Sequence, residues 1–204
     1  MPSRNVVKEY APDSYYHVYA RGVSKQKIFI EAADYKYFYY LFDRYIGKGQ
    51  KVSKTGVPYP NFNKQIQLVA YCLMTNHFHL LVHQKNADDL QLFMKSMMTS
   101  YSRYFNLKYN RSGPVFESRY KAVRVDSQQY LEHITRYIHL NPRRWENYIN
   151  SSLRYYKDAH EPKWLNTRFI LSIFSSREDY AKFVSDYEEM RDMLSEMKYQ
   201  LADQ

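Results

Sequence analysis

The sequence predicts an α+β protein built on a ferredoxin-like antiparallel sheet in βαββαβ order, with helices on one face, a third helix and a C-terminal helical extension. Three observations predict this class. Short runs rich in aromatic and β-branched residues alternate with segments that carry apolar residues at helical spacing. Two of the runs are separated by a tight turn. With 204 residues, the chain is also long enough to bury a core.

A strand and a helix open the predicted domain. Residues 15–20 are aromatic and branched and end at Arg21-Gly22, which indicates a strand and a turn. Residues 32–45 carry apolar and aromatic side chains at helical spacing. Residues 46–65 contain five glycines and prolines and four lysines but no acid, which is typical of a loop. We expect a mobile insertion here.

A hairpin and a second helix follow this loop. Residues 66–74 and 77–83 are both β-rich and are separated only by Thr75-Asn76, so they predict a tight hairpin. The pair Asp88-Asp89 is a typical acidic start for a helix, which we expect to reach about residue 107.

The last strand and helix of the domain are predicted at 115–125 and 127–140. Asn141-Pro142 ends this helix, because the residue before a proline is disfavoured in the α region. We therefore expect a domain over residues 1–150 and a helical extension over 151–204, acidic from residue 178. The helices of the extension are predicted at 166–174 and 177–201.

The charge of the chain points to an anionic partner. Thirty Lys and Arg against 21 Asp and Glu give a formal net charge of +9. Residues 178–204 are net −5, so the rest of the chain is net +14. Basic residues interleaved with 23 tyrosines suit nucleic-acid binding. The apolar runs are far too short to span a bilayer, and a single cysteine excludes a disulfide framework. We expect a cytoplasmic, nucleoid-associated protein without membrane contact.

A His-x-His motif lies in the second run of the hairpin. Because side chains alternate along a strand, His77 and His79 leave the same face, with Cα atoms ~6.6 Å apart, and Phe78 points to the core. Two imidazoles at this spacing can converge on one divalent ion. His83 shares the face but lies ~20 Å from His77, too far for the same ion. The motif is also typical of an ordinary polar sheet face.

A tyrosine and an amide share one face of the helix at 127–140. Tyr137 and Asn141 are four residues apart and lie beside the apolar row of Leu131, Ile134 and Ile138. A free tyrosine has a pKa of ~10, so as a nucleophile it needs a metal-activated phosphate or a nearby base. Otherwise Tyr137 is a core-edge residue and Asn141 a helix terminator.

Four sequence blocks together resemble the single-tyrosine HUH transposases (IS200-like), most of all the REP-associated tyrosine transposases. The blocks are HVYARG at 17–22, AYCLMTNHFHLLV at 70–82, GPVFESRYKAV at 113–123 and RYIHLNP at 136–142. The resemblance covers about residues 13–150, and the segments WLNTRFILSIF and REDYAKFV are similar to the tail of the REP-associated branch.

The resemblance implies a DNA-binding transposase. Such an enzyme cleaves and rejoins single-stranded DNA at hairpins or repeats by metal-dependent transesterification, through a 5′-phosphotyrosine and without a nucleotide cofactor. Tyr137 is then the nucleophile, and His77 and His79 are metal ligands. Asn141 lies where relatives place a third ligand, often Gln. Two imidazoles and an amide oxygen suit Mg²⁺ or Mn²⁺.

Basic residues close to these motifs are expected to bind DNA phosphates. Each of them, taken singly, is also a typical solvated surface charge. The predicted DNA-binding residues are Arg21, Lys25, Arg103, Arg111, Arg119, Lys121, Arg124, Arg143 and Arg144.

The sequence leaves other functions open, and it is compatible with a monomer or a homodimer. One alternative is a non-catalytic or domesticated protein that binds nucleic-acid hairpins. An RNA-recognition module uses a similar sheet, but its Lys/Arg-Gly-Phe motif is absent from the chain. A phosphodiesterase with paired histidine motifs would need two His-x-Thr/Ser elements, and the chain has one His-x-His. Relatives are monomers or homodimers, in which the tyrosine helix completes the site of its own or of the partner chain.

Overall fold

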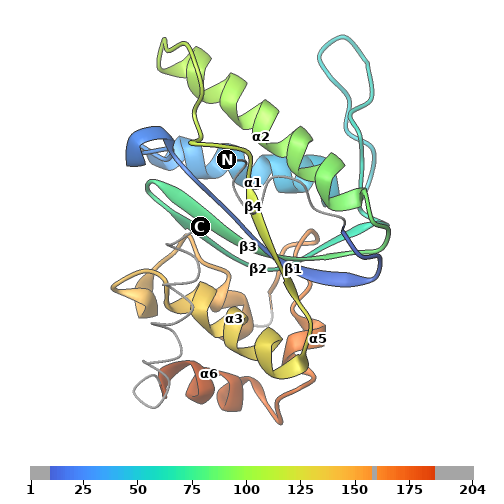
Figure 1. Cartoon of the computed structure of the whole chain (residues 1–204), viewed down its shortest axis with the longest axis vertical. Helices are drawn as coiled ribbons and strands as arrows, with labels where there is room; N and C mark the ends of the chain where they lie inside the picture. The colour runs from blue at the N-terminus through green and yellow to red at the C-terminus, as the bar shows by residue number, and fades with distance from the viewer. Residues whose placement is uncertain (1–9, 158–159, 187–204) are drawn as a thin grey trace, which may run out of the picture.

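The computed structural model describes residues 10–157 and 160–186, which form a four-stranded antiparallel sheet with helices on both sides (Figure 1). The strand order is β2-β3-β1-β4, the order of a ferredoxin-like sheet, and the predicted βαββαβ succession is confirmed. In chain order the strands and α-helices are β1 (Ser14–Arg21), α1 (Ala32–Ile46), β2 (Ile66–Met74), β3 (His77–Gln84), α2 (Asp89–Lys108), β4 (Lys121–Val125), α3 (Gln128–Leu140), α4 (Leu153–Lys157), α5 (Arg168–Leu171) and α6 (Arg177–Ser185).

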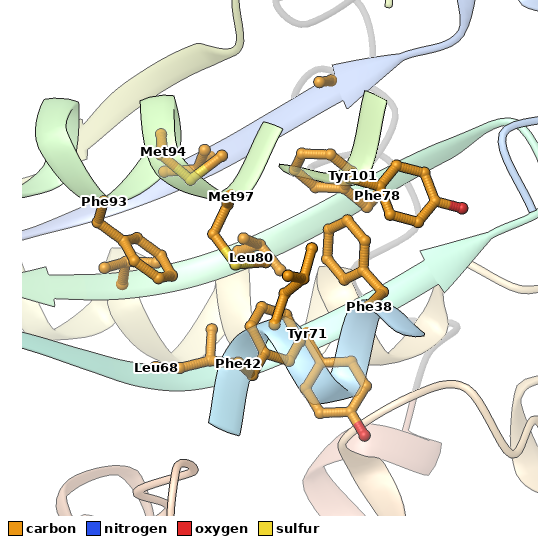
Figure 2. Packing of buried hydrophobic residues seen from close by; sticks show 14 of the residues in the cluster. Phe38, Phe42, Leu68, Tyr71, Phe78, Leu80, Phe93, Met94, Met97 and Tyr101 are labelled. Carbon is orange, nitrogen blue, oxygen red and sulfur yellow. The ribbon is translucent and has the colours of Figure 1, made fainter. Parts of the chain in front are cut away.

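One face of the sheet packs against α1 and α2 (Figure 1). Alternate residues of the central strands, among them Val18, Phe78 and Leu80, are fully buried on this face. Figure 2 shows Phe78 beside Phe38 of α1 and Tyr101 of α2, and the rings of Phe38 and Phe78 lie 5.4 Å apart between centroids. This core fixes the register of β3, because a slip of one residue would turn every side chain to the opposite face.

The opposite face is covered by α3 and the C-terminal helices (Figure 1). Ile134 and Ile138 of α3 share a buried cluster with Tyr156 of α4 and Tyr180 of α6. His139 joins these elements, because its Nδ1 lies 2.7 Å from Tyr180 Oη and its Nε2 lies 2.7 Å from Ser152 Oγ. The extension thus packs directly against the helix that carries Tyr137. The division of the chain at residue 150 stays a prediction.

Two details near the end of the predicted domain differ from expectation. The last strand begins at Lys121 and not at residue 115, because β1 ends at Arg21 and only one isolated bridge, Gly22 with Phe116, continues the pairing. The helix α3 does end before Pro142, but Asn141 keeps α-helical dihedral angles (φ −57°, ψ −40°). The missing N–H of proline, and not an extended Asn141, therefore ends the hydrogen-bond ladder.

Within the described residues, the helices of the extension differ in position from those predicted. The helix predicted at 166–174 is confined to Arg168–Leu171, and α4 lies outside the two helices predicted for the extension. The helix predicted at 177–201 is present as Arg177–Ser185, and its part beyond residue 186 lies outside the described residues. The loop predicted at 46–65 is confirmed except at Ile46, which ends α1, because residues 47–65 contain no helix or extended strand. In the described part of the chain, no helix is long and apolar enough to cross a membrane.

Candidate active site

The strand β3 presents His77 and His79 on the face that α3 covers. In the register with β1, His77 lies opposite Arg21 and His79 lies opposite Tyr19. The two imidazole rings lie 5.1 Å apart between centroids and are nearly perpendicular, at 86°. His79 is buried, with 5% of its surface exposed, whereas His77 at the hairpin end is partly exposed.

The helix α3 brings Tyr137 and Asn141 to this pair. The ring of Tyr137 lies 5.5 Å from that of His79, and 6% of this tyrosine is exposed. Asn141 directly follows the last residue of α3, and its Oδ1 lies 3.0 Å from Nε2 of His77. Residues from a strand and a helix that are far apart in the sequence therefore form one cluster.

The proton arrangement at His77 suits a cation. Burial lowers the pKa of His77, so the neutral ring carries a single N–H at pH 7. Its Nδ1 lies 2.7 Å from Oδ1 of Asn76, whose own amide nitrogen donates to the Lys25 carbonyl. When Nδ1–H donates to Asn76, Nε2 of His77 and Oδ1 of Asn141 face each other as two lone pairs. Two lone pairs 3.0 Å apart repel unless a cation binds both, so this donor set fits a metal ion.

His79 has a similar arrangement through a third histidine. Its Nδ1 lies 2.9 Å from Nε2 of His17, a fully buried residue of β1. Burial lowers the pKa of His17 to about 3 and that of His79 well below its ordinary value, so both rings are neutral. Among the described residues, no hydrogen-bond partner lies at Nε2 of His79. That nitrogen is available as a ligand.

An ion at this site would have few protein ligands. Within the described ranges, no three His, Cys, Asp or Glu side chains gather as a metal-binding group. The ligands would be Nε2 of His77, Nε2 of His79 and Oδ1 of Asn141. Water and a phosphate oxygen would complete the shell, which suits Mg²⁺ or Mn²⁺.

Tyr137 is a protonated phenol at neutral pH. Burial, together with the neighbouring Tyr19, raises its pKa to about 12, while Arg21 and a hydrogen bond with Asn141 act in the opposite direction. A phenol of this kind is a weak nucleophile until positive charge near the reacting phosphate lowers the barrier.

The structure brings only some of the predicted DNA-binding residues to this face. Arg21 lies opposite His77, Lys121 lies opposite Tyr19, and the exposed Arg143 and Arg144 follow Asn141. Lys25 lies near the hairpin turn, where its carbonyl accepts from Asn76. Arg21 and Lys121 therefore lie beside the cluster, and the other three belong to segments that adjoin it.

Of the four remaining predicted DNA-binding residues, two lie on the opposite face of the sheet. Arg103 is on α2, which covers the opposite face, and Arg124 pairs in register with Tyr16, which belongs to the core on that face. Arg111 contacts Gln26 at 3.5 Å, and Arg119 is exposed in the segment before β4. His83, which was excluded as a ligand, contacts Asp13 at 3.0 Å.

Sequence reasoning missed His17 and Asn76. The signal for His17 was present, because His17, Tyr19 and Arg21 alternate along β1 with the same period of two as His77 and His79. The register that pairs the two strands was not visible in the sequence. Asn76 was interpreted only as a turn residue.

The His-x-His motif and the tyrosine helix both lie within a segment that matches a known protein family. Residues 60–141 match the family described as transposase, IS200 like. This confirms the resemblance to IS200-like transposases. The IS200-like segment runs from the end of the lysine-rich loop to Asn141, so it contains the histidine pair and the tyrosine helix.

Two solved structures are similar to this chain. One is described as the REP-associated tyrosine transposase bound to a REP hairpin. It has 10% sequence identity and a TM-score of 0.57, and the match covers 79% of this chain and 90% of that one. At this identity the match shows a shared fold. The other is a crystal structure of a protein from Deinococcus radiodurans, provisionally described as a transposase. It has 16% sequence identity and a TM-score of 0.39, and the match covers 65% of this chain and 94% of that one. Among curated proteins no match is found.

Proposed function

We propose that this protein is a metal-dependent transposase that cleaves and rejoins single-stranded DNA, with Tyr137 as the nucleophile. The observation that carries the proposal is the facing pair of His77 Nε2 and Asn141 Oδ1, 3.0 Å apart, beside Tyr137 and His79. The IS200-like match supports the transposase class. DNA hairpins are supported as the substrate by the four sequence blocks that resemble REP-associated tyrosine transposases.

The reaction exchanges one phosphoester bond for another. The Tyr137 oxygen attacks the scissile phosphorus in line with the O3′ leaving group, and the phosphorus–O3′ bond breaks as the phosphorus–tyrosine bond forms. One product carries its 5′-phosphate on Tyr137. The other ends in a 3′-hydroxyl, because O3′ takes up one proton for the one that the Tyr137 phenol loses, so the step is balanced. A second 3′-hydroxyl reverses the step, so no nucleotide cofactor is required. A bound Mg²⁺ or Mn²⁺ would neutralise charge on the phosphate oxygens.

The packing of the cluster favours a single strand as substrate. Because Tyr137 and His79 are nearly buried, the scissile phosphate has to enter between α3 and the sheet. One strand can be inserted there more readily than a duplex. Arg21, Lys121 and Arg143, which lie on or next to the elements of the cluster, would bind its backbone. Since one chain supplies both the histidine pair and Tyr137, we propose that a monomer is sufficient for cleavage.

A cleavage assay tests this proposal. End-labelled single-stranded hairpins from the flanks of the gene are incubated with the protein and Mg²⁺ or Mn²⁺, with EDTA as the metal control. We expect cleavage by the wild type and by Tyr130→Phe, a matched change on the same helix, and none by Tyr137→Phe. Cleavage by Tyr137→Phe at the wild-type rate would contradict the proposal. Tight binding by the wild type without cleavage in either metal would favour a non-catalytic hairpin-binding protein.

A further inference from the structure

The third histidine of the cluster, His17, has an unusual environment. It is fully buried on β1, its Nδ1 has no hydrogen-bond partner among the described residues, and its Nε2 lies 2.9 Å from Nδ1 of His79. The planes of the two rings differ by 17°, which suits an in-plane hydrogen bond. A buried imidazole with one unsatisfied nitrogen is costly. Packing alone would favour an apolar side chain here.

The direction of this hydrogen bond decides what His79 can do. A neutral pair shares one hydrogen between His17 Nε2 and His79 Nδ1. If His17 donates it, His79 carries its own hydrogen on Nε2, and that nitrogen cannot bind a cation. If His79 donates it, Nε2 of His79 is left with a free lone pair. The same logic applies to His77, which can donate its Nδ1–H to Asn76.

We propose that His17 is a positioning residue that accepts the Nδ1–H of His79 and thereby holds His79 in the tautomer and orientation required for a metal ligand. This inference rests on the proposed metal site of the transposase. It assigns to His17 the role that outer-shell acceptors have at histidine ligands in general, where their loss typically weakens metal binding by ~10–100-fold.

Titration of metal-free protein with Mn²⁺ by calorimetry tests the role of His17. His17→Phe keeps a planar ring but removes the acceptor, and we expect its Mn²⁺ affinity to fall ~10–100-fold. In His17→Gln, the amide oxygen is the same number of bonds from Cβ as Nε2 of histidine, so this variant should keep most of the affinity. His83→Phe is the matched control, because His83 lies on the same strand face but contacts Asp13. It should bind Mn²⁺ like the wild type.

A double variant separates positioning from general loss of structure. In a His79→Ala background, His17→Phe should cause no further loss of affinity, because the ligand through which His17 acts is absent. Further loss of tenfold or more in this background would overturn the proposal. So would equal Mn²⁺ affinities of the wild type and His17→Phe. A wild type that binds no Mn²⁺ would overturn the metal site itself and the role of His17 with it.

A measurement on the wild type covers the case in which His17→Phe does not fold. Long-range ¹H–¹⁵N correlation spectra of the Mg²⁺-loaded protein report which ring nitrogen carries hydrogen. We expect hydrogen on Nδ1 of both His79 and His17. Hydrogen on Nε2 of His17 would mean that His17 is the donor, and the proposal would be wrong.

Discussion

At the scale of single residues, the site depends on which ring nitrogen of each proposed histidine ligand keeps a free lone pair. Asn76 and His17 each lie at Nδ1 of a proposed ligand, 2.7 Å and 2.9 Å away. In both ligands Nε2 is then the nitrogen that is left to bind an ion. Asn141 contributes the oxygen that completes the set.

Replacement of Asn141 tests the third ligand. Asn141→Leu removes the oxygen that lies 3.0 Å from His77 Nε2, so Mn²⁺ affinity should fall about tenfold or more. Asn141→Asp keeps an oxygen and adds negative charge, so it should bind Mn²⁺ at least as tightly as the wild type. Calorimetric titration measures both. Equal affinities of the leucine variant and the wild type would remove Asn141 from the site.

The sequence predicts the proposed metal ligands and nucleophile better than the residues that support them. His77, His79 and Tyr137 follow from a strand period of two, a helix period of 3.6 and the family resemblance. His17 acts through a partner 62 positions away, and this contact depends on the pairing of β1 with β3. Local patterns do not determine that register.

At the scale of elements, β3 and α3 position the site, and each is held from a different side. The strand is fixed by the aromatic core beneath α1 and α2, and the helix by its contacts with α4 and α6. The first strand, first helix and hairpin were predictable because their side-chain periods are clear. The start of β4 and the helix α4 were not, because a missing partner strand and distant packing decide them.

Removal of the N-terminal cap of α3 should destabilise the protein. Oγ of Ser127 accepts from the Tyr130 N–H at 3.2 Å, so Ser127→Ala should lower the free energy of unfolding by ~1 kcal/mol. Urea unfolding measures this change. Ser118→Ala is the control, since its exposed hydroxyl bonds only to the adjacent Arg119 carbonyl. Equal destabilisation by both changes would contradict the capping role.

At the scale of the whole molecule, buried neutral histidines make stability depend on pH. Burial lowers the pKa of His17 and of His139 to about 3. The unfolded chain binds protons at both below pH ~6.5, whereas the folded protein does not until the pH approaches about 3. Stability is therefore fully present above pH ~6.5 and is lost as the pH falls, by ~1.4 kcal/mol per pH unit for each histidine. Urea unfolding at pH 7 and pH 5 should show this loss. Equal stabilities at the two values would contradict it.

The basic surface around the site predicts salt-dependent binding of DNA. Affinity for a single-stranded hairpin should fall as the salt concentration rises. The magnitude of the slope of log affinity against log salt concentration should decrease by ~0.7 for each single-strand phosphate contact removed. Arg21→Gln should reduce the slope, because Arg21 lies opposite His77. Arg103→Gln should not, because Arg103 lies on α2 over the opposite face. Fluorescence anisotropy at several salt concentrations measures both slopes, and a larger effect of Arg103 would place the DNA on the other face.

The most direct test of the proposed mechanism is to locate the covalent bond between the protein and the DNA that this mechanism requires. Wild-type protein is incubated with a single-stranded hairpin and Mg²⁺, denatured and digested, and the peptides that carry a nucleotide are sequenced by tandem mass spectrometry. We predict a 5′-phosphate linked to the hydroxyl of Tyr137, formed only when metal is present. A nucleotide attached to any other residue, or cleaved DNA without any attached peptide, would contradict the assignment of Tyr137 as the nucleophile.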